Sequence, residues 1–280
     1  MKHWILYNPF AGSEKCKVKA QELYEKYEEA ELIDVTKLES LSELIDKKAK
    51  GDRVILCGGD GTLNRFVNMP RIEEIADDLY FCAVGSGNDF SNDVGKSTET
   101  EPFPIASYMK KLAKAEIKGE TYHFVNGLGL GIDGFCCQIA NAMHKKGKKI
   151  SYALIALIGL LFGFKPADAV IRVDGKEYRY KRVWMATTMK GRYFGGGVKI
   201  VPDQDRMDSE GKVSIIVAHD VSRLRALTAF PLILKGHYKM FPRIVAVLKG
   251  KEISVSYVQP EPLQIDGETI LDVESYTVRT

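Results

Sequence analysis

The sequence RVILCGGDGTLN at residues 53–64 decides the fold class. It begins with apolar residues that favour a buried strand, and a glycine-rich turn follows at once at residues 58–62. A helical pattern starts directly after the turn, and strand, turn and helix in this order form the unit of a parallel α/β sheet. Strands are predicted in this way at residues 4–7, 31–35, 53–57 and 80–84, each followed by a turn or a helical pattern. Residues 1–120 are therefore predicted to form an α/β domain with a parallel sheet.

The pattern changes after about residue 120, where short β-favouring runs dominate. These runs occupy residues 121–126, 169–173, 179–188, 212–218, 252–257, 262–265 and 275–278. An Asp-Gly pair at 174–175 is a typical hairpin turn between two of them. Helix-like segments at 150–164 and 222–239 interrupt the series. Residues 121–280 are therefore predicted to form a second, mostly antiparallel β-rich domain.

The charges are divided unevenly between the two predicted domains. Residues 1–120 hold 17 basic and 22 acidic residues, a net charge of −5, whereas residues 121–280 hold 23 and 15, a net charge of +8. The whole chain of 280 residues carries only +3, which is too little to indicate a nucleic-acid-binding protein. An anionic partner should therefore face the second domain.

Cysteine usage and hydrophobicity indicate a cytoplasmic protein. The five cysteines, an odd number, lack metal-ligand spacing and are expected to be free thiols in a reducing compartment. The apolar run at the N-terminus is too short for a signal peptide. The longest uncharged stretch, 150–164, has 15 residues, which is short of the roughly 20 that a membrane-spanning helix needs.

The glycine-rich turn at 58–62 is suited to bind phosphate. Its three glycines expose backbone N–H groups without a Cβ in the way, and the following helix N-terminus favours an anion. Asp60 would repel phosphate, so it is expected to hold Mg²⁺ against it; the alternative is a structural turn in which Asp60 caps a helix. A second turn, GSGNDF at 85–90, adds a hydroxyl, an amide and a carboxylate at the same edge of the sheet. Neither the P-loop nor the dinucleotide-binding pattern of glycines occurs at these turns.

Five motifs, taken together and in order, resemble the diacylglycerol kinase catalytic family, which includes sphingosine and ceramide kinases and bacterial lipid kinases. They are NPxxG at 8–12, GGDGTLN at 58–64, GSxNDF at 85–90, GGG at 195–197 and DGE at 266–268. The resemblance covers nearly the whole chain. It implies that the α/β domain binds ATP with Mg²⁺, that the β-rich domain serves the lipid substrate, and that the lipid enters between them.

The resemblance also implies which residues contact ATP. They are Asn8, Pro9, Phe10, Ala11, Gly12, Thr36, Gly58, Gly59, Gly61, Thr62, Leu63, Asn64, Ser86 and Asn88. Ser86 stands where the family usually has Thr, a change that keeps the hydroxyl group.

Four carboxylates are implied to carry the chemistry. Asp60, Asp89 and Asp133 resemble a network that organises the catalytic Mg²⁺, and Glu268 matches the proposed general base that takes the proton of the lipid hydroxyl. The alternative for Glu268 is a solvated residue of a hairpin turn.

A second Mg²⁺ site of the family would fall on Asp205, Asp208 and Glu210. The Asp-Gly pair that usually follows is lengthened here, and a solvated acidic turn is the alternative. The Asn that usually precedes the GGG motif is replaced by Lys190.

Two stretches combine basic and apolar residues and suggest attachment to a membrane surface. In the first, a basic cluster at 144–149 runs into the apolar segment 150–164; the second lies at 222–243. We expect part of each stretch to pack in the core and the basic ends to face anionic phospholipid, which places the protein at the inner membrane surface. The alternative is that both stretches pack entirely in the core.

The function predicted on these grounds is an ATP-dependent lipid kinase that phosphorylates a lipid hydroxyl such as that of diacylglycerol. One alternative is an NAD kinase-like enzyme, which shares the GGDGT motif; another is a non-catalytic lipid-binding protein on the same fold. The expected partners are a lipid substrate and anionic phospholipid but no nucleic acid, and a homodimer is left open.

Overall fold

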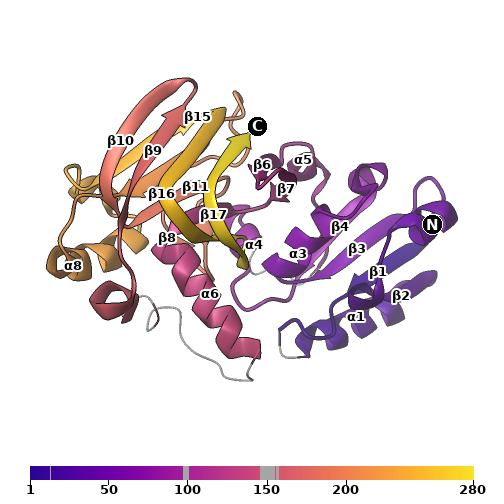
Figure 1. Cartoon of the computed structure of the whole chain (residues 1–280). Coiled ribbons are helices and arrows are strands. Elements are labelled where there is room, and N and C mark those ends of the chain that lie inside the picture. Colours follow the sequence, from indigo (N-terminus) through magenta and orange to yellow (C-terminus); the bar gives the residue numbers. More distant parts are fainter. Residues whose placement is uncertain (13, 97–100, 146–154, 156–157) are drawn as a thin grey trace. The chain divides into compact units, whose positions relative to one another are not determined.

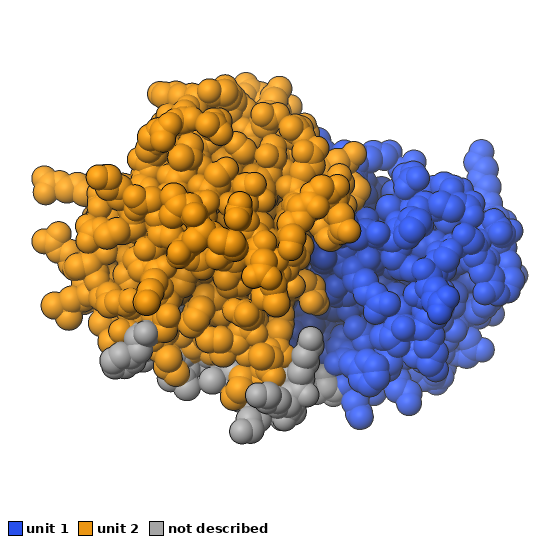
Figure 2. Space-filling model, viewed as in Figure 1, with its two compact units in different colours: residues 1–112 blue, residues 113–280 orange. Residues whose placement is uncertain are grey.

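The computed structural model describes residues 1–12, 14–96, 101–145, 155 and 158–280, which form two compact units (Figures 1 and 2). The units are Met1–Leu112 and Ala113–Thr280. The sequence predicted the change of domain after residue 120. The units divide earlier because β6 (Ala113–Ile117) pairs with β7 (Glu120–Phe124) and with the last strand of the chain.

The first unit is built on a five-stranded sheet in the order β2-β1-β3-β4-β5. The first four strands are parallel and β5 is antiparallel to β4, so the predicted α/β domain is confirmed. The strands are β1 (His3–Tyr7), β2 (Ala30–Asp34), β3 (Arg53–Gly58), β4 (Leu79–Ala83) and β5 (Phe103–Pro104). The helices are α1 (Lys15–Lys26), α2 (Ser42–Lys47), α3 (Asp60–Val67), α4 (Asp89–Asp93) and α5 (Ala106–Met109), with short turns at Val35–Lys37, Ile72–Glu74 and Ala76–Asp78.

The apolar face of α1 covers one side of this sheet. Cys16, Ala20 and Leu23 recur at helical spacing and pack against Ile5 and Ile55 of the two central strands. The cysteines of this unit also lie in the core as free thiols, as do Cys136 and Cys137 of the second unit.

The second unit is a ten-stranded sheet in which every pairing between described strands is antiparallel. Its main path runs β15-β14-β11-β8-β16-β17-β6-β7, and β9 joins β10 to the side of β16. The remaining strands of the unit are β8 (Gly127–Gly131), β9 (Ala167–Val173), β10 (Lys176–Val183), β11 (Met185–Met189), β14 (Val213–Ala218), β15 (Val245–Gly250), β16 (Glu252–Ile265) and β17 (Glu268–Arg279), with a small hairpin of β12 (Tyr193–Phe194) and β13 (Val198–Lys199). The predicted antiparallel β-rich domain is thus confirmed.

Two apolar cores stabilise the second unit, one on each face of the sheet. Strands as far apart in the order as β14 and β6 contribute to the first core, through Ile215 and Ala115, so the sheet must curl around it. On the other face, α6 (Ile132–Lys145), α8 (Arg223–Leu234) and the π-helical turn η4 (Gly159–Gly163) pack on β11 and β14; η5 (Tyr238–Met240) lies beside them. Phe164, Trp184 and Phe230 fill this second core with aromatic contacts.

The two basic and apolar stretches are described only in part. The cluster at 146–149 lies outside the described residues, as do most of residues 150–157, and the side chains of 144 and 145 are not described either. Ile155, Leu160 and Phe164 are buried, whereas Ile158 and Leu161 are exposed. In the described part of the chain, no helix has the length and apolar character needed to cross a bilayer.

Candidate functional site

The glycine-rich turns of the first unit meet at the carboxyl edge of its sheet. Parallel pairing aligns Tyr7 with Cys57 and Gly58 with Ala83, so the loops that follow β1, β3 and β4 leave the sheet side by side (Figure 1). The amide of Asn8 donates a hydrogen bond of 2.9 Å to the Thr62 hydroxyl, which joins the first loop to α3. Three of the predicted motifs are therefore brought together at one edge.

The loops approach so closely that only glycine fits at several of their positions. A Cβ added to Gly59 would lie 3.1 Å from the Cα of Gly85. Gly12 has a φ of +61°, and a Cβ there would lie 2.0 Å from the carbonyl oxygen of Val84. The sequence assigned these glycines to phosphate contact, and the structure adds that the backbone of one loop packs against the backbone of the next.

Asp60 uses its carboxylate to hold the second loop. Its Oδ2 accepts a hydrogen bond from the backbone N–H of Asp89 and its Oδ1 accepts one from Phe90, each at 2.9 Å. Both donors lie in the first turn of α4, so Asp60 caps α4 rather than its own helix. The sequence analysis proposed Mg²⁺ binding with capping as the alternative, and it is capping that the structure displays.

The other residues predicted to contact ATP differ in exposure. Phe10 is 82% exposed, and Gly61 and Ser86 are also exposed, whereas Thr62, Leu63 and Asn64 are buried. Pro9 and Ala11 are half-buried in the loop after β1, and Gly58 is buried at the end of β3. Two of the polar side chains bond within their own loops: Thr36 donates to Asp34 Oδ1, and Asn88 Oδ1 accepts from the N–H of Gly85. The exposed part of this set lies around the N-terminus of α3, where backbone N–H groups and the helix dipole favour a phosphate group.

In the second unit, Asp266 and Gly267 form a two-residue hairpin turn that ends at Glu268. Both turn residues have positive φ angles, 46° and 93°, and Ile265 pairs with Glu268 across the turn. The Asp266 carboxylate accepts hydrogen bonds from three consecutive backbone N–H groups, those of Val125, Asn126 and Gly127. The sequence analysis gave Asp266 no role of its own. The Asp-Gly pair signals the turn, but the donors come from 139 to 141 residues earlier in the chain and no local pattern indicates them.

Helix α6 holds the other side of this turn. The carbonyl oxygen of Gly267 accepts from the Cys137 thiol at 2.9 Å and from the Asn141 amide at 3.3 Å, and Asn141 also donates to the Thr269 hydroxyl at 3.0 Å. The Glu268 side chain is exposed, and its carboxylate has no hydrogen-bond or ion-pair partner among the described residues. A carboxylate on a turn fixed from both sides is suited to accept a proton from a bound hydroxyl group.

Asp133 begins α6 and faces β8 and β11. It accepts from the Thr187 hydroxyl at 2.6 Å and from the backbone N–H of Gly134 at 3.0 Å. Burial raises the pKa of the Asp133 carboxyl to about 6, and these two hydrogen bonds oppose the shift. Gly129 of β8 leaves room for this arrangement, because a Cβ there would lie 2.4 Å from Asp133 Oδ2. The network of Asp133 with Asp60 and Asp89 stays a prediction.

The carboxylates after Pro202 are engaged within their own turns. Asp205 Oδ1 accepts from the N–H of Met207, and Asp208 Oδ1 accepts from the N–H groups of Glu210 and Lys212. Glu210 forms an ion pair with Lys212. In the described part of the chain, no group of three or more His, Cys, Asp or Glu side chains could hold a metal ion. The structure therefore does not support the predicted metal site at Asp205, Asp208 and Glu210; the acidic turn that was its alternative fits instead.

Two family models cover both units of the chain. Residues 2–120 match the diacylglycerol kinase catalytic domain, and residues 127–277 match the YegS C-terminal NAD kinase beta sandwich-like domain. The chain belongs to the diacylglycerol kinase family. Membership of this family makes it a kinase, and the resemblance inferred from the motifs is confirmed.

Individual diacylglycerol kinases are similar to this chain along most of its length. The diacylglycerol kinase of Bacillus subtilis (strain 168) is 22% identical over 275 residues, 94% of this chain and 88% of the relative. That of Mycobacterium tuberculosis (strain CDC 1551 / Oshkosh) is 27% identical over 196 residues, 67% of this chain and 62% of the relative. A crystal structure of a diacylglycerol kinase from Bacillus anthracis str. Sterne superposes with a TM-score of 0.60 at 17% identity, covering 99% of this chain and 93% of that one, which shows a shared fold.

Proposed function

We propose that this kinase transfers the γ-phosphoryl group of ATP to the hydroxyl group of a lipid alcohol such as diacylglycerol. The observation that carries the proposal is the pair of held loops: the phosphate-type edge of the first unit, fixed by Asp60, and the turn of the second unit that presents Glu268. Several relatives along the whole chain are named diacylglycerol kinases, which supports this class of substrate.

The chain's own residues divide the work in this proposal. Backbone N–H groups around Gly59 and the start of α3 bind the phosphates of ATP, and exposed Phe10 provides an apolar surface beside them. Glu268 accepts the proton of the lipid hydroxyl as its oxygen bonds to phosphorus. Asp266 does not touch the substrate but holds the turn that carries Glu268. Mg²⁺ is expected to accompany ATP and stays a prediction; no step above depends on it.

The test is phosphoryl transfer from labelled ATP to a panel that contains diacylglycerol, other lipid alcohols and NAD. We expect labelled lipid product with at least one lipid alcohol and none with NAD. Transfer to NAD alone would favour the NAD kinase-like alternative. Binding of lipid without transfer to any acceptor would favour a non-catalytic lipid-binding protein. Glu268→Gln serves as the control, because it keeps size and hydrogen bonding but cannot accept the proton.

A further inference from the structure

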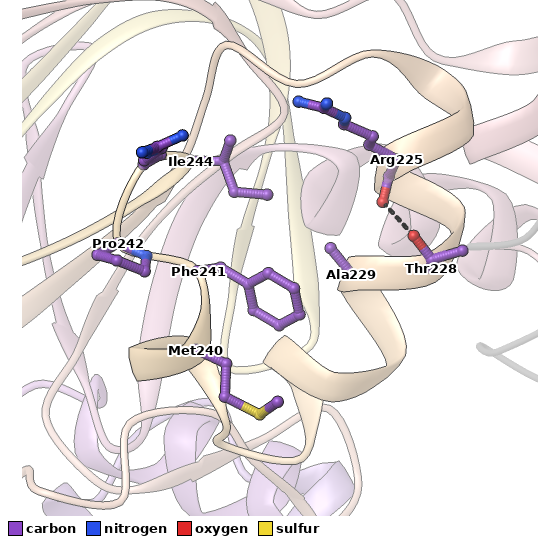
Figure 3. Close-up of a pocket in the computed structure, with 8 residues that line it drawn as sticks. Arg225, Thr228, Ala229, Met240, Phe241, Pro242 and Ile244 are labelled. Carbon is purple, nitrogen blue, oxygen red and sulfur yellow. Dashed lines mark hydrogen bonds between the residues drawn. The ribbon is translucent and has the colours of Figure 1, made fainter.

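A pocket of about 340 Å³ lies on the second unit between α8 and the loop after η5 (Figure 3). Arg225, Thr228 and Ala229 line it from the helix, and Met240, Phe241, Pro242, Arg243 and Ile244 line it from the loop. Its size is at the small end of ligand pockets and suits a headgroup rather than a whole lipid. None of these residues belongs to the candidate catalytic site.

The two arginines at this pocket lack counter-ions. Residues 221–251 contain seven Lys or Arg and no Asp or Glu. Other cations of this stretch are engaged: Arg223 donates to the carbonyl oxygens of Leu160 and Phe164, and Lys239 pairs with Asp203. Arg225 and Arg243 are exposed, and neither side chain has a hydrogen-bond or ion-pair partner in the described part of the chain. The pocket therefore presents two unneutralised guanidinium groups.

Large apolar side chains stand in solvent beside these cations. Leu224 is 78% exposed and Met240 is 65% exposed. Ile158 is 46% exposed next to the η4 turn, to which Arg223 ties α8 through its bond to Leu160. Figure 3 shows Met240 and Phe241 on the side of the pocket that faces Ala229 and Thr228. An apolar rim around cations is typical of surfaces that meet the lipid interface.

We propose that this surface docks on an anionic phospholipid bilayer. The docking surface consists of Leu224, Arg225, Met240, Phe241 and Arg243. The phosphate of one lipid headgroup binds in the pocket between Arg225 and Arg243, and Leu224 and Met240 insert among the acyl chains. A free anion would gain nothing from the apolar rim, whereas a bilayer satisfies both the charges and the exposed apolar side chains. This site holds the enzyme to its membrane and is independent of phosphoryl transfer.

The test is sedimentation of the whole protein with phosphatidylcholine vesicles, with and without phosphatidylglycerol. We expect binding that needs phosphatidylglycerol and weakens as salt is raised. Arg225→Gln together with Arg243→Gln should lower the partition coefficient roughly 10- to 30-fold, because each basic residue near an anionic surface contributes comparably. Leu224→Ser together with Met240→Ser should lower binding even at low salt.

A matched control separates the pocket from overall charge. Lys114 of β6 and Lys181 of β10 are exposed residues of the same unit, and replacing both by Gln removes the same charge. We expect this variant to bind nearly as well as the unmodified protein, and an equal loss would overturn the proposal. Arg225→Lys with Arg243→Lys should restore binding only in part, since lysine lacks the bidentate fork; full restoration would refute headgroup binding in the pocket. Release from the vesicles by inorganic phosphate at constant ionic strength would show a site for free phosphate and refute the bilayer as occupant.

Discussion

Replacing Asp266 by Asn should loosen the turn that carries Glu268 and slow phosphoryl transfer. The two oxygens of the Asp266 carboxylate accept three backbone N–H groups, with Asn126 at 2.8 Å and Gly127 at 2.9 Å sharing Oδ1. An Asn side chain can keep its oxygen on the two Oδ1 donors, but its amide nitrogen then faces the N–H of Val125. One charge-assisted hydrogen bond is lost and two become neutral, so we expect the local structure to be destabilised by about 2–4 kcal/mol.

Hydrogen exchange measures this change where it occurs. The amides of Val125, Asn126 and Gly127 should exchange roughly 30-fold faster or more in the variant, because local opening costs less free energy. Amides of the first unit should be unaffected. Steady-state kinetics should show kcat reduced by roughly 10- to 100-fold with little change in the KM for ATP, since a displaced general base slows the chemical step.

The Asp-Gly turn at Asp174 provides the matched control. Asp174 and Gly175 also have positive φ angles, and Asp174 Oδ1 accepts from the N–H groups of Lys251 and Glu252 at 2.9 Å. Asp174→Asn should destabilise its own turn and leave kcat unchanged. Unchanged exchange at Asn126 in the Asp266 variant would refute the anchoring role. An equal fall in kcat in the Asp174 variant would show that the effect is not specific to the turn of Glu268.

Three further predictions concern the carboxylates. Glu268→Gln should lower kcat by roughly 10²–10⁴ with little change in ATP affinity, the range for a lost general base; an unchanged kcat would remove Glu268 from the mechanism. Asp60→Ala should abolish transfer and speed amide exchange at Asp89 and Phe90, and normal exchange there would contradict the capping role. Burial raises the pKa of Asp133 to about 6 from 3.8, so the native state binds its proton more tightly than the unfolded state does. The stability of the second unit in urea should therefore fall as pH rises from about 4 to about 6, and Asp133→Asn should remove that slope.

The fold could be predicted because its signals are local. Each strand of the first unit runs into its turn within a few residues, as at residues 53–64, and hydrophobic pattern and glycine position are enough to recognise the unit. The domain boundary was less accessible. β6 is assigned to the second unit by its pairing with β17, for example Ala115 with Val278, and a short strand carries no mark of a partner so far along the chain.

The site was predictable in its membership but not in its contacts. The motifs located the glycine edge and the turn of Glu268, yet the metal assignment at Asp205, Asp208 and Glu210 failed on geometry. Acidic residues spaced by two or three positions satisfy a ligand pattern equally well when each one bonds to backbone N–H groups of its own turn. Spacing alone does not distinguish the two uses of a carboxylate.

Asp60 and Asp266 share a structural role that their motifs do not reveal. Each adjoins a glycine, and each accepts backbone N–H groups from a loop that is distant in sequence: 29 and 30 residues away for Asp60, and 139 to 141 for Asp266. The glycine allows the backbones to approach, and the carboxylate then fixes the distance between them by charge-assisted hydrogen bonds. In each unit the residue placed by this device, Asp89 in one and Glu268 in the other, is itself a predicted catalytic carboxylate. An aspartate in such a motif can therefore be essential for activity by positioning its neighbour, and loss of activity on its replacement does not by itself identify a metal ligand.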